Sequence, residues 1–181
     1  GWTLFQMNEY TKAQAEFSAL SAQTDDPNLK SKAVFFTGMC KKKLNQPDEA
    51  LTVFENLVRK YPKSDYRDDA FYEMGLLYFS NEDFDTALEN FQSVISINQD
   101  DVLKELSVKG MADCYFRMDN SEKGLDLINS YEFKNPRLLS KTLFEAGYSF
   151  FKKGEYAKAG KYFNIVIKST ENDSLKLQSV Y

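Results

Sequence analysis

The sequence repeats itself at intervals of 37 or 35 residues, and this period limits its possible folds more than any other feature. In each copy, a small anchor residue is followed by an aromatic residue or lysine three positions later, by Ala or Gly twelve positions later and by a large apolar residue sixteen positions later. A fixed period of 20–50 residues is typical of arrays of one supersecondary unit. The four copies, and a partial copy before them, are Gly38, Lys41, Ala50 and Phe54; Gly75, Tyr78, Ala87 and Phe91; Ala112, Tyr115, Gly124 and Ile128; Gly147, Phe150, Ala159 and Phe163; and Leu4, Ala13 and Phe17.

Each copy has the apolar spacing of two helices. Around one anchor, Phe71, Met74 and Tyr78 project within about 100° of one another on a helix and form a core stripe. In the second half, apolar residues at i, i+3, i+7, i+10 and i+11 form a matching stripe from Phe84 to Ile95 and again from Tyr156 to Ile167. The spacing therefore predicts an all-α fold built of antiparallel helical hairpins.

Turn-forming residues separate the predicted helices and set the repeat boundaries. Breaks fall at 45–47, 81–83, 119–121 and 153–155, and Pro136 begins a further first helix. We expect repeats at about 1–24 (partial), 28–62, 65–99, 102–133, 136–171 and 173–181 (the start of a further repeat). We also expect the chain to be part of a longer array that can self-associate through uncapped ends.

The pattern resembles the tetratricopeptide repeat, with Val34, Gly38, Ala50, Phe54 and Pro62 in one copy and the corresponding residues of the next copy from 71 to 91. The resemblance implies a right-handed α-solenoid whose first helices line a concave groove for partner segments. Two features depart from the family pattern. The period of 37 exceeds the usual 34, which places extra residues in the linkers, and Gly124 stands where Ala is expected.

The linker from Tyr61 to Tyr72 resembles a Tyr-Pro-x-Ser…Asp-Ala-x-Tyr junction of bacterial periplasmic members of this family. Those members include the Tol-associated cell-division coordinator and the BamD-like lipoproteins of outer-membrane assembly. The alternative is a proline stop followed by a Ser or Asp cap, which any helical array can use. The junction favours a periplasmic over a cytoplasmic location, but the sequence leaves the compartment unknown.

The amino-acid composition argues against most kinds of catalytic and metal-binding site. The chain has no histidine, which excludes histidine-assisted triads and the common zinc sites, and its two cysteines occupy equivalent packing positions. Its net charge of −4 argues against nucleic acid, and no run of residues resembles a membrane span. Acidic pairs such as Asp68 and Asp69 lie where helices begin and complement the helix dipole. We therefore predict no catalytic residues, no metal, no cofactor and no enzymatic activity.

A second stripe on the first helices is the candidate binding surface. It lies about 140° from the core stripe, where an amphipathic helix normally has polar residues, and it is rich in aromatic and basic residues. Counting the positions six before the anchors, the row has seven basic residues and two acidic residues, Asp69 and Asp113. The predicted groove residues are Phe35, Met39, Lys42, Tyr72, Leu76, Phe79, Lys109, Phe116, Arg117, Lys141, Phe144, Tyr148 and Phe151.

The stripe predicts a non-catalytic scaffold that binds a protein or peptide segment with apolar anchors and some negative charge. Two alternatives remain open at this stage. The aromatic residues can instead pack on neighbouring repeats, and Lys42 lies in a last helical turn where a cation offsets the dipole. The chain can also be a regulatory or oligomerisation segment of a larger protein with an enzyme domain elsewhere.

Overall fold

A computed structural model of the chain describes residues 1–97 and 100–169, which form ten α-helices and no strand. The predicted all-α fold is therefore confirmed, and the predicted repeat start at 173–181 lies outside the described residues. The helices are α1 (Trp2–Gln6), α2 (Tyr10–Gln23), α3 (Pro27–Lys43), α4 (Pro47–Lys60), α5 (Arg67–Ser80), α6 (Phe84–Ile97), α7 (Asp101–Arg117), α8 (Ser121–Ser130), α9 (Pro136–Lys152) and α10 (Tyr156–Ser169).

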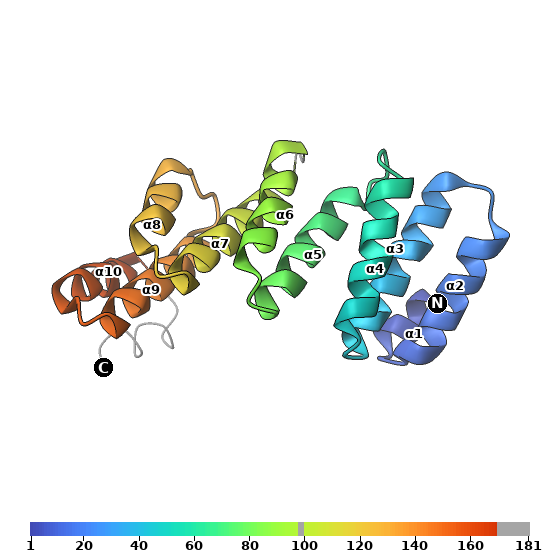
Figure 1. Cartoon of the computed structure of the whole chain (residues 1–181), viewed down its shortest axis with the longest axis horizontal. Helices are drawn as coiled ribbons and strands as arrows, with labels where there is room; N and C mark the ends of the chain where they lie inside the picture. The colour runs from blue at the N-terminus through green and yellow to red at the C-terminus, as the bar shows by residue number, and fades with distance from the viewer. Residues whose placement is uncertain (98–99, 170–181) are drawn as a thin grey trace. The chain divides into compact units, whose positions relative to one another are not determined.

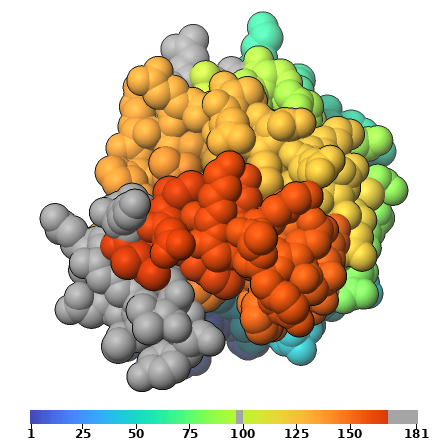
Figure 2. Space-filling view, turned by 90° about the vertical axis from the view of Figure 1, so that its left-hand side faces the viewer, coloured from blue at the N-terminus to red at the C-terminus, as the bar shows by residue number. Residues whose placement is uncertain are grey.

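The chain divides into two compact units, residues 1–77 and 78–181. In the first unit α2 packs on α1 and on α3, and α3 packs on α4. In the second unit α7 packs on α6, α8 and α9, and α9 packs on α8 and α10. Figure 1 shows α2, α3 and α4 side by side in the first unit and α7 to α10 side by side in the second. The space-filling view shows α9 and α10, coloured orange to red, pressed directly against each other (Figure 2).

The same three-residue turn joins the two helices of every hairpin. Its middle residue has a left-handed backbone, with φ between 59° and 77°. The N–H after it reaches back to a carbonyl in the last helical turn, as from Gln46 to Lys41 at 3.0 Å, which is the Schellman arrangement. The left-handed residues, Asn8, Asn45, Glu82, Asp119 and Gly154, recur at the sequence period.

Anchor glycines lie where the two helices of a hairpin cross. A Cβ atom on Gly38 would lie 2.6 Å from the ring of Phe54, and one on Gly147 would lie 2.7 Å from Phe163. Only glycine permits this approach. The hairpin of α7 and α8 reverses the arrangement, because its close contact joins Gly124 of α8 to Phe116 of α7. The unusual Gly124 therefore makes room for the ring of Phe116.

Polar side chains tie two of the first helices, α3 and α7, to the linkers that follow their hairpins. The Ser64 hydroxyl donates to the hydroxyl of Ser31 at 2.8 Å. Glu105, only 3% exposed, occupies the equivalent position and accepts from the backbone N–H groups of Lys134 and Asn135. These bonds satisfy donors of the linker that precedes α9.

The cysteines and acidic pairs have structural roles. Cys40 and Cys114 are free and fully buried, and burial raises the pKa of the first thiol to about 11 and that of the second to about 12. Asp26 and Asp100 cap α3 and α7 by accepting from backbone N–H groups at 2.9 and 2.8 Å. The acidic residues thus stabilise helix starts, as predicted.

Candidate functional site: the α7–α9 groove

A groove of about 680 Å³ lies between the C-terminal halves of α7 and α9. Both are first helices of their hairpins, and they contact each other directly. The groove contains both apolar and charged side chains, so it combines shape with charge. Its lining residues are Phe116, Arg117, Asp119, Glu145, Tyr148, Ser149, Lys152 and Lys153.

Two aromatic side chains of α9 are open to solvent, one of them lining the groove and the other one helical turn further along. Tyr148 is 48% exposed and lines the groove, and Phe151, three positions later on α9, is 50% exposed. The Phe151 ring meets the ring of Tyr156 edge-on, at 5.6 Å between centroids. Burying such rings against a partner releases water from a large apolar area, which makes them natural anchors.

Basic residues surround the aromatic side chains, but several are already paired. The Arg117 guanidinium lies 2.9 Å from a carboxylate oxygen of Glu82 and over the rings of Phe79 and Phe84. Lys153 pairs with Asp119 at 3.3 Å. Both pairs lower the net positive charge that the groove offers to a partner.

Two other cations of α9 have no ion-pair partner among the described residues. The Lys152 ammonium lies 5.9 Å from the centroid of the Tyr148 ring, and Lys141 is exposed. The groove lining itself has three basic residues and two acidic residues. Its local excess of positive charge is therefore smaller than the count along the sequence row suggests.

Lys109 and Asp113 form an ion pair along α7, four residues apart. The second carboxylate oxygen of Asp113, Oδ1, is buried without a hydrogen-bond partner among the described residues. Burial raises the pKa of Asp113 above its usual value, while Lys109 and the more distant Lys141 oppose the increase. The ion pair is largely buried, so it exposes little charge to a partner.

The structure corrects the prediction for two of the thirteen groove residues. Phe35 and Phe116 are each 7% exposed, so both rings lie mainly in the core, although Phe116 also lines the α7–α9 groove. Phe35 packs on Phe54, and Phe144 packs in the same way on Phe163. Both contacts lie within a single hairpin, because the second helix of the hairpin offers each ring an apolar neighbour, so they do not test the alternative of packing on neighbouring repeats.

The other predicted residues are partly open. Met39, Tyr72, Leu76, Phe79, Lys109 and Phe144 are half-buried, and Arg117, Lys141, Tyr148 and Phe151 are exposed. Lys42, also half-buried, forms an ion pair with Glu73. The α7–α9 groove brings together Phe116, Arg117 and Tyr148.

The sequence analysis missed several residues of the groove, namely Asp119, Glu145, Ser149 and Lys153. Asp119 and Lys153 belong to the turns after α7 and α9, and the prediction considered the helices alone. The repeat pattern itself could have indicated them. The turns after α7 and α9 are equivalent, and Asp119 and Lys153 occupy neighbouring positions of these turns, so oppositely charged side chains are expected close together. Ser149 is buried and shares a hydrogen bond of 2.9 Å with Ser121.

The structure gives no sign of metal chemistry or of a membrane span in the part of the chain that it describes. No group of three or more potential metal-ligating side chains occurs among those residues. None of the described helices combines the length and the apolar character needed to cross a bilayer.

These hairpins, with their repeated turns and glycine crossings, define an all-α repeat protein of the class that mediates protein–protein interactions. Two sequence models described as tetratricopeptide repeat match the chain, one at residues 35–64 and 141–169 and the other at 68–101. The chain belongs to the tetratricopeptide repeat family. No curated protein sequence matches it at a significant level.

Solved structures of other proteins have the same fold. The crystal structure of MamA matches with a TM-score of 0.75 at 18% identity, over 95% of each chain. YrrB, described as a tetratricopeptide repeat protein with an unusual peptide-binding site, matches with a TM-score of 0.69 at 18% identity, over 98% of this chain and 86% of its own. The C-terminal part of a repeat protein from Cytophaga hutchinsonii matches with a TM-score of 0.70 at 18% identity, over 93% and 63% of the two chains.

Proposed function

We propose that the chain is a non-catalytic scaffold that binds a segment of a partner protein in the α7–α9 groove. One observation supports this proposal above the others: α9 exposes Tyr148 and Phe151 beside a groove of about 680 Å³. Large apolar side chains exposed together on a folded protein usually mark an interface. YrrB shares the fold and has a peptide-binding site, which is consistent with the proposal.

The charges favour a partner with apolar anchors and a few carboxylates. Lys141 and Lys152 lack ion-pair partners among the described residues, so a carboxylate of the partner can pair with them without breaking an existing bridge. Arg117 is already engaged by Glu82. The rings therefore supply most of the affinity, and the two lysines supply a smaller, salt-dependent contribution.

A peptide-display selection tests the proposal because it samples many partner sequences at once. Random 12-residue peptides are selected on the whole chain and then measured against the Tyr148→Ala/Phe151→Ala variant. We expect selected peptides to contain an aromatic or aliphatic anchor with nearby acidic residues and to lose affinity by about 2 kcal/mol or more per ring removed.

The matched control is Val102→Ala, which removes an exposed apolar side chain at the start of α7, outside the groove lining. It should leave the affinity of the selected peptides unchanged. Circular dichroism should show the same helical content for all variants, because the substituted side chains are exposed. Peptides that bind the double variant as tightly as the original chain would show that the groove is not the binding site.

A further inference from the structure

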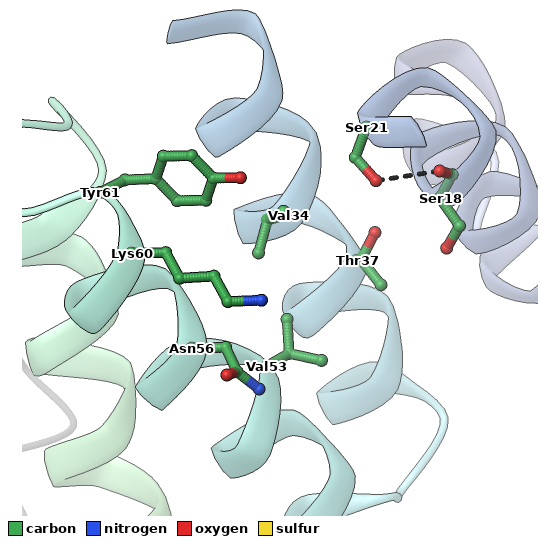
Figure 3. A pocket seen from close by; sticks show the side chains of 8 residues that line it. All are labelled: Ser18, Ser21, Val34, Thr37, Val53, Asn56, Lys60 and Tyr61. Atoms are coloured by element: carbon green, nitrogen blue, oxygen red, sulfur yellow. Dashed lines mark hydrogen bonds between the residues drawn. The ribbon is translucent and has the colours of Figure 1, made fainter. Parts of the chain in front are cut away.

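A second, smaller cavity opens in the first unit, between the second helices α2 and α4, with α3 as its floor (Figure 3). Its volume is about 220 Å³. Sites for drug-sized ligands usually span about 300–1,000 Å³, so this cavity suits a single side chain better than a cofactor. Its lining residues are Ser18, Ser21, Val34, Thr37, Val53, Asn56, Lys60 and Tyr61.

The cavity exists because this junction has small polar side chains where the next two repeats have large apolar ones. Thr37 of α3 occupies the position that Met74 and Met111 occupy in the next two repeats. Ser21 of α2 likewise corresponds to Val58 and Ile95. In the next two repeats bulky apolar side chains fill this contact between hairpins. Here the smaller hydroxyl-bearing side chains leave space and add polar groups.

The open hydrogen-bonding groups of the cavity are mainly donors. The Lys60 ammonium and the Tyr61 hydroxyl extend from the α4 side over the floor, and Ser18 and Ser21 face them from α2 (Figure 3). Neither the Lys60 ammonium nor the Tyr61 hydroxyl has a hydrogen-bond or ion-pair partner among the described residues, whereas Ser21 already donates to the carbonyl of Ser18. One hydrogen of the Asn56 amide is also unused, since the other bonds to Thr52.

The charge of the cavity is of one sign. Of the described residues that line the cavity, only Lys60 is charged, and none has a carboxylate. Val34 and Val53 add an apolar wall beside the donors. A ligand that matches this lining has a short apolar stem and ends in an anionic acceptor.

From these features we infer a second binding site, in which this cavity holds the acidic side chain of a glutamate from a partner protein. The two methylene groups of the glutamate lie against Val34 and Val53, and its carboxylate accepts from Lys60 and Tyr61. Hydrogen bonds to a charged group are the stronger ones, so these two donors determine the affinity.

This site is separate from the face of the first helices predicted to line the groove. Val34 and Thr37 lie on α3 at about 140° from the row that contains Met39 and Lys42, at 100° per residue. A partner held here therefore contacts the second helices α2 and α4 and leaves the first-helix face free. The chain can in this way engage two segments at once.

The test uses the whole ¹⁵N-labelled chain and small carboxylates as probes. N-acetylglutamate α-amide is titrated and the backbone amide shifts of Ser18, Thr37 and Asn56 are followed by NMR. We expect saturable shifts at these residues, with a dissociation constant in about the millimolar range for so small a ligand. The uncharged probe N-acetylglutamine amide should bind at least about tenfold more weakly.

Variants locate the interaction. Lys60→Gln should weaken the charged probe about tenfold, and Tyr61→Phe should weaken it by a smaller factor. Lys63→Gln is the matched control, because Lys63 is exposed, lies outside the lining and loses the same charge. If Lys60→Gln and Lys63→Gln raised the dissociation constant of the charged probe equally, general electrostatic attraction would explain the binding. That result would overturn the inference.

Two further probes distinguish the source of the anion. N-acetylalanine presents a chain-terminal carboxylate, and inorganic phosphate presents a phosphoryl group. We expect both to bind more weakly than N-acetylglutamate α-amide, because neither combines a flexible apolar stem with a terminal carboxylate. Tighter binding of either probe, or equal binding of the glutamine derivative, would contradict a glutamate site.

Discussion

Substitution of Gly38 by alanine tests the close crossing of α3 and α4. Alanine has the higher helix propensity, and on that ground alone Gly38→Ala would stabilise the helix by about 0.5–1 kcal/mol. The structure predicts the opposite sign. The new Cβ atom would lie 2.6 Å from the ring of Phe54, well inside van der Waals contact.

The size of the effect follows from how little Phe54 can move. Its ring is fully buried and packs on Phe35 at 5.7 Å between centroids. Overpacking of such a site costs about 1–3 kcal/mol, so at the middle of the two ranges a net loss of about 1 kcal/mol remains after the gain in propensity. For a chain of this length each kcal/mol corresponds to about 2–4 °C in thermal midpoint.

The assay is urea and thermal unfolding followed by circular dichroism, with Gly160→Ala as the matched control. Apart from the adjacent backbone of its own helix, no described residue comes within 4 Å of where a Cβ atom on Gly160 would lie, so alanine there should stabilise the chain by about 0.5–1 kcal/mol. A double-mutant cycle adds Phe54→Leu, which should partly rescue Gly38→Ala. The packing argument would be refuted if Gly38→Ala were as stable as Gly160→Ala.

Three further predictions concern single side chains. Glu105→Ala should cost about 1–3 kcal/mol and remove hydrogen-exchange protection from the N–H of Asn135, because it leaves the linker donors unsatisfied. Glu82→Gly should leave the stability against urea unchanged or raise it. Glycine relieves the strain of the left-handed backbone (φ 61°), and this gain outweighs the small free energy lost with the exposed ion pair to Arg117. A clear loss of stability would contradict this. Because the pKa of the Cys114 thiol is raised to about 12, the native chain should stay unlabelled by a thiol reagent at pH 8 and react only after unfolding. The Cys114 thiol of the unfolded chain ionises above about pH 9, whereas that of the folded chain ionises only near pH 12. Between these pH values ionisation favours the unfolded chain, so the free energy of unfolding should fall as the pH rises.

The sequence predicts the architecture well because local rules determine it. The anchor spacing predicts hairpins, and turn residues such as Asn45 and Asp119 coincide with the left-handed positions of the structure. The crossing of Gly38 and Phe54 follows from the same repeat pattern, since both positions recur with the period.

The candidate site is less predictable because it depends on pairs of residues far apart in the chain. The angle of Phe116 on its helix places it in the groove row, yet Gly124 of the next helix leaves a space that draws the ring into the core. The pairing of Arg117 with Glu82 joins residues 35 positions apart and cannot be deduced from either helix alone. Charge counts along one helix face therefore overstate the charge that a partner meets.

Among the connections between helices, those within hairpins keep one length and those between hairpins vary. The turn within each hairpin has three residues in all five cases, whereas the linkers between hairpins differ, with residues 61–66 after α4 and 131–135 after α8. The fixed turns depend on a left-handed residue and a specific backbone bond, so an inserted residue would break both. For protein engineering, new chain ends, epitope tags or sensor domains belong at exposed linker positions such as 62–63 and 132, which avoid the bonded residues Ser64, Lys134 and Asn135, while the turns within hairpins should be left unchanged.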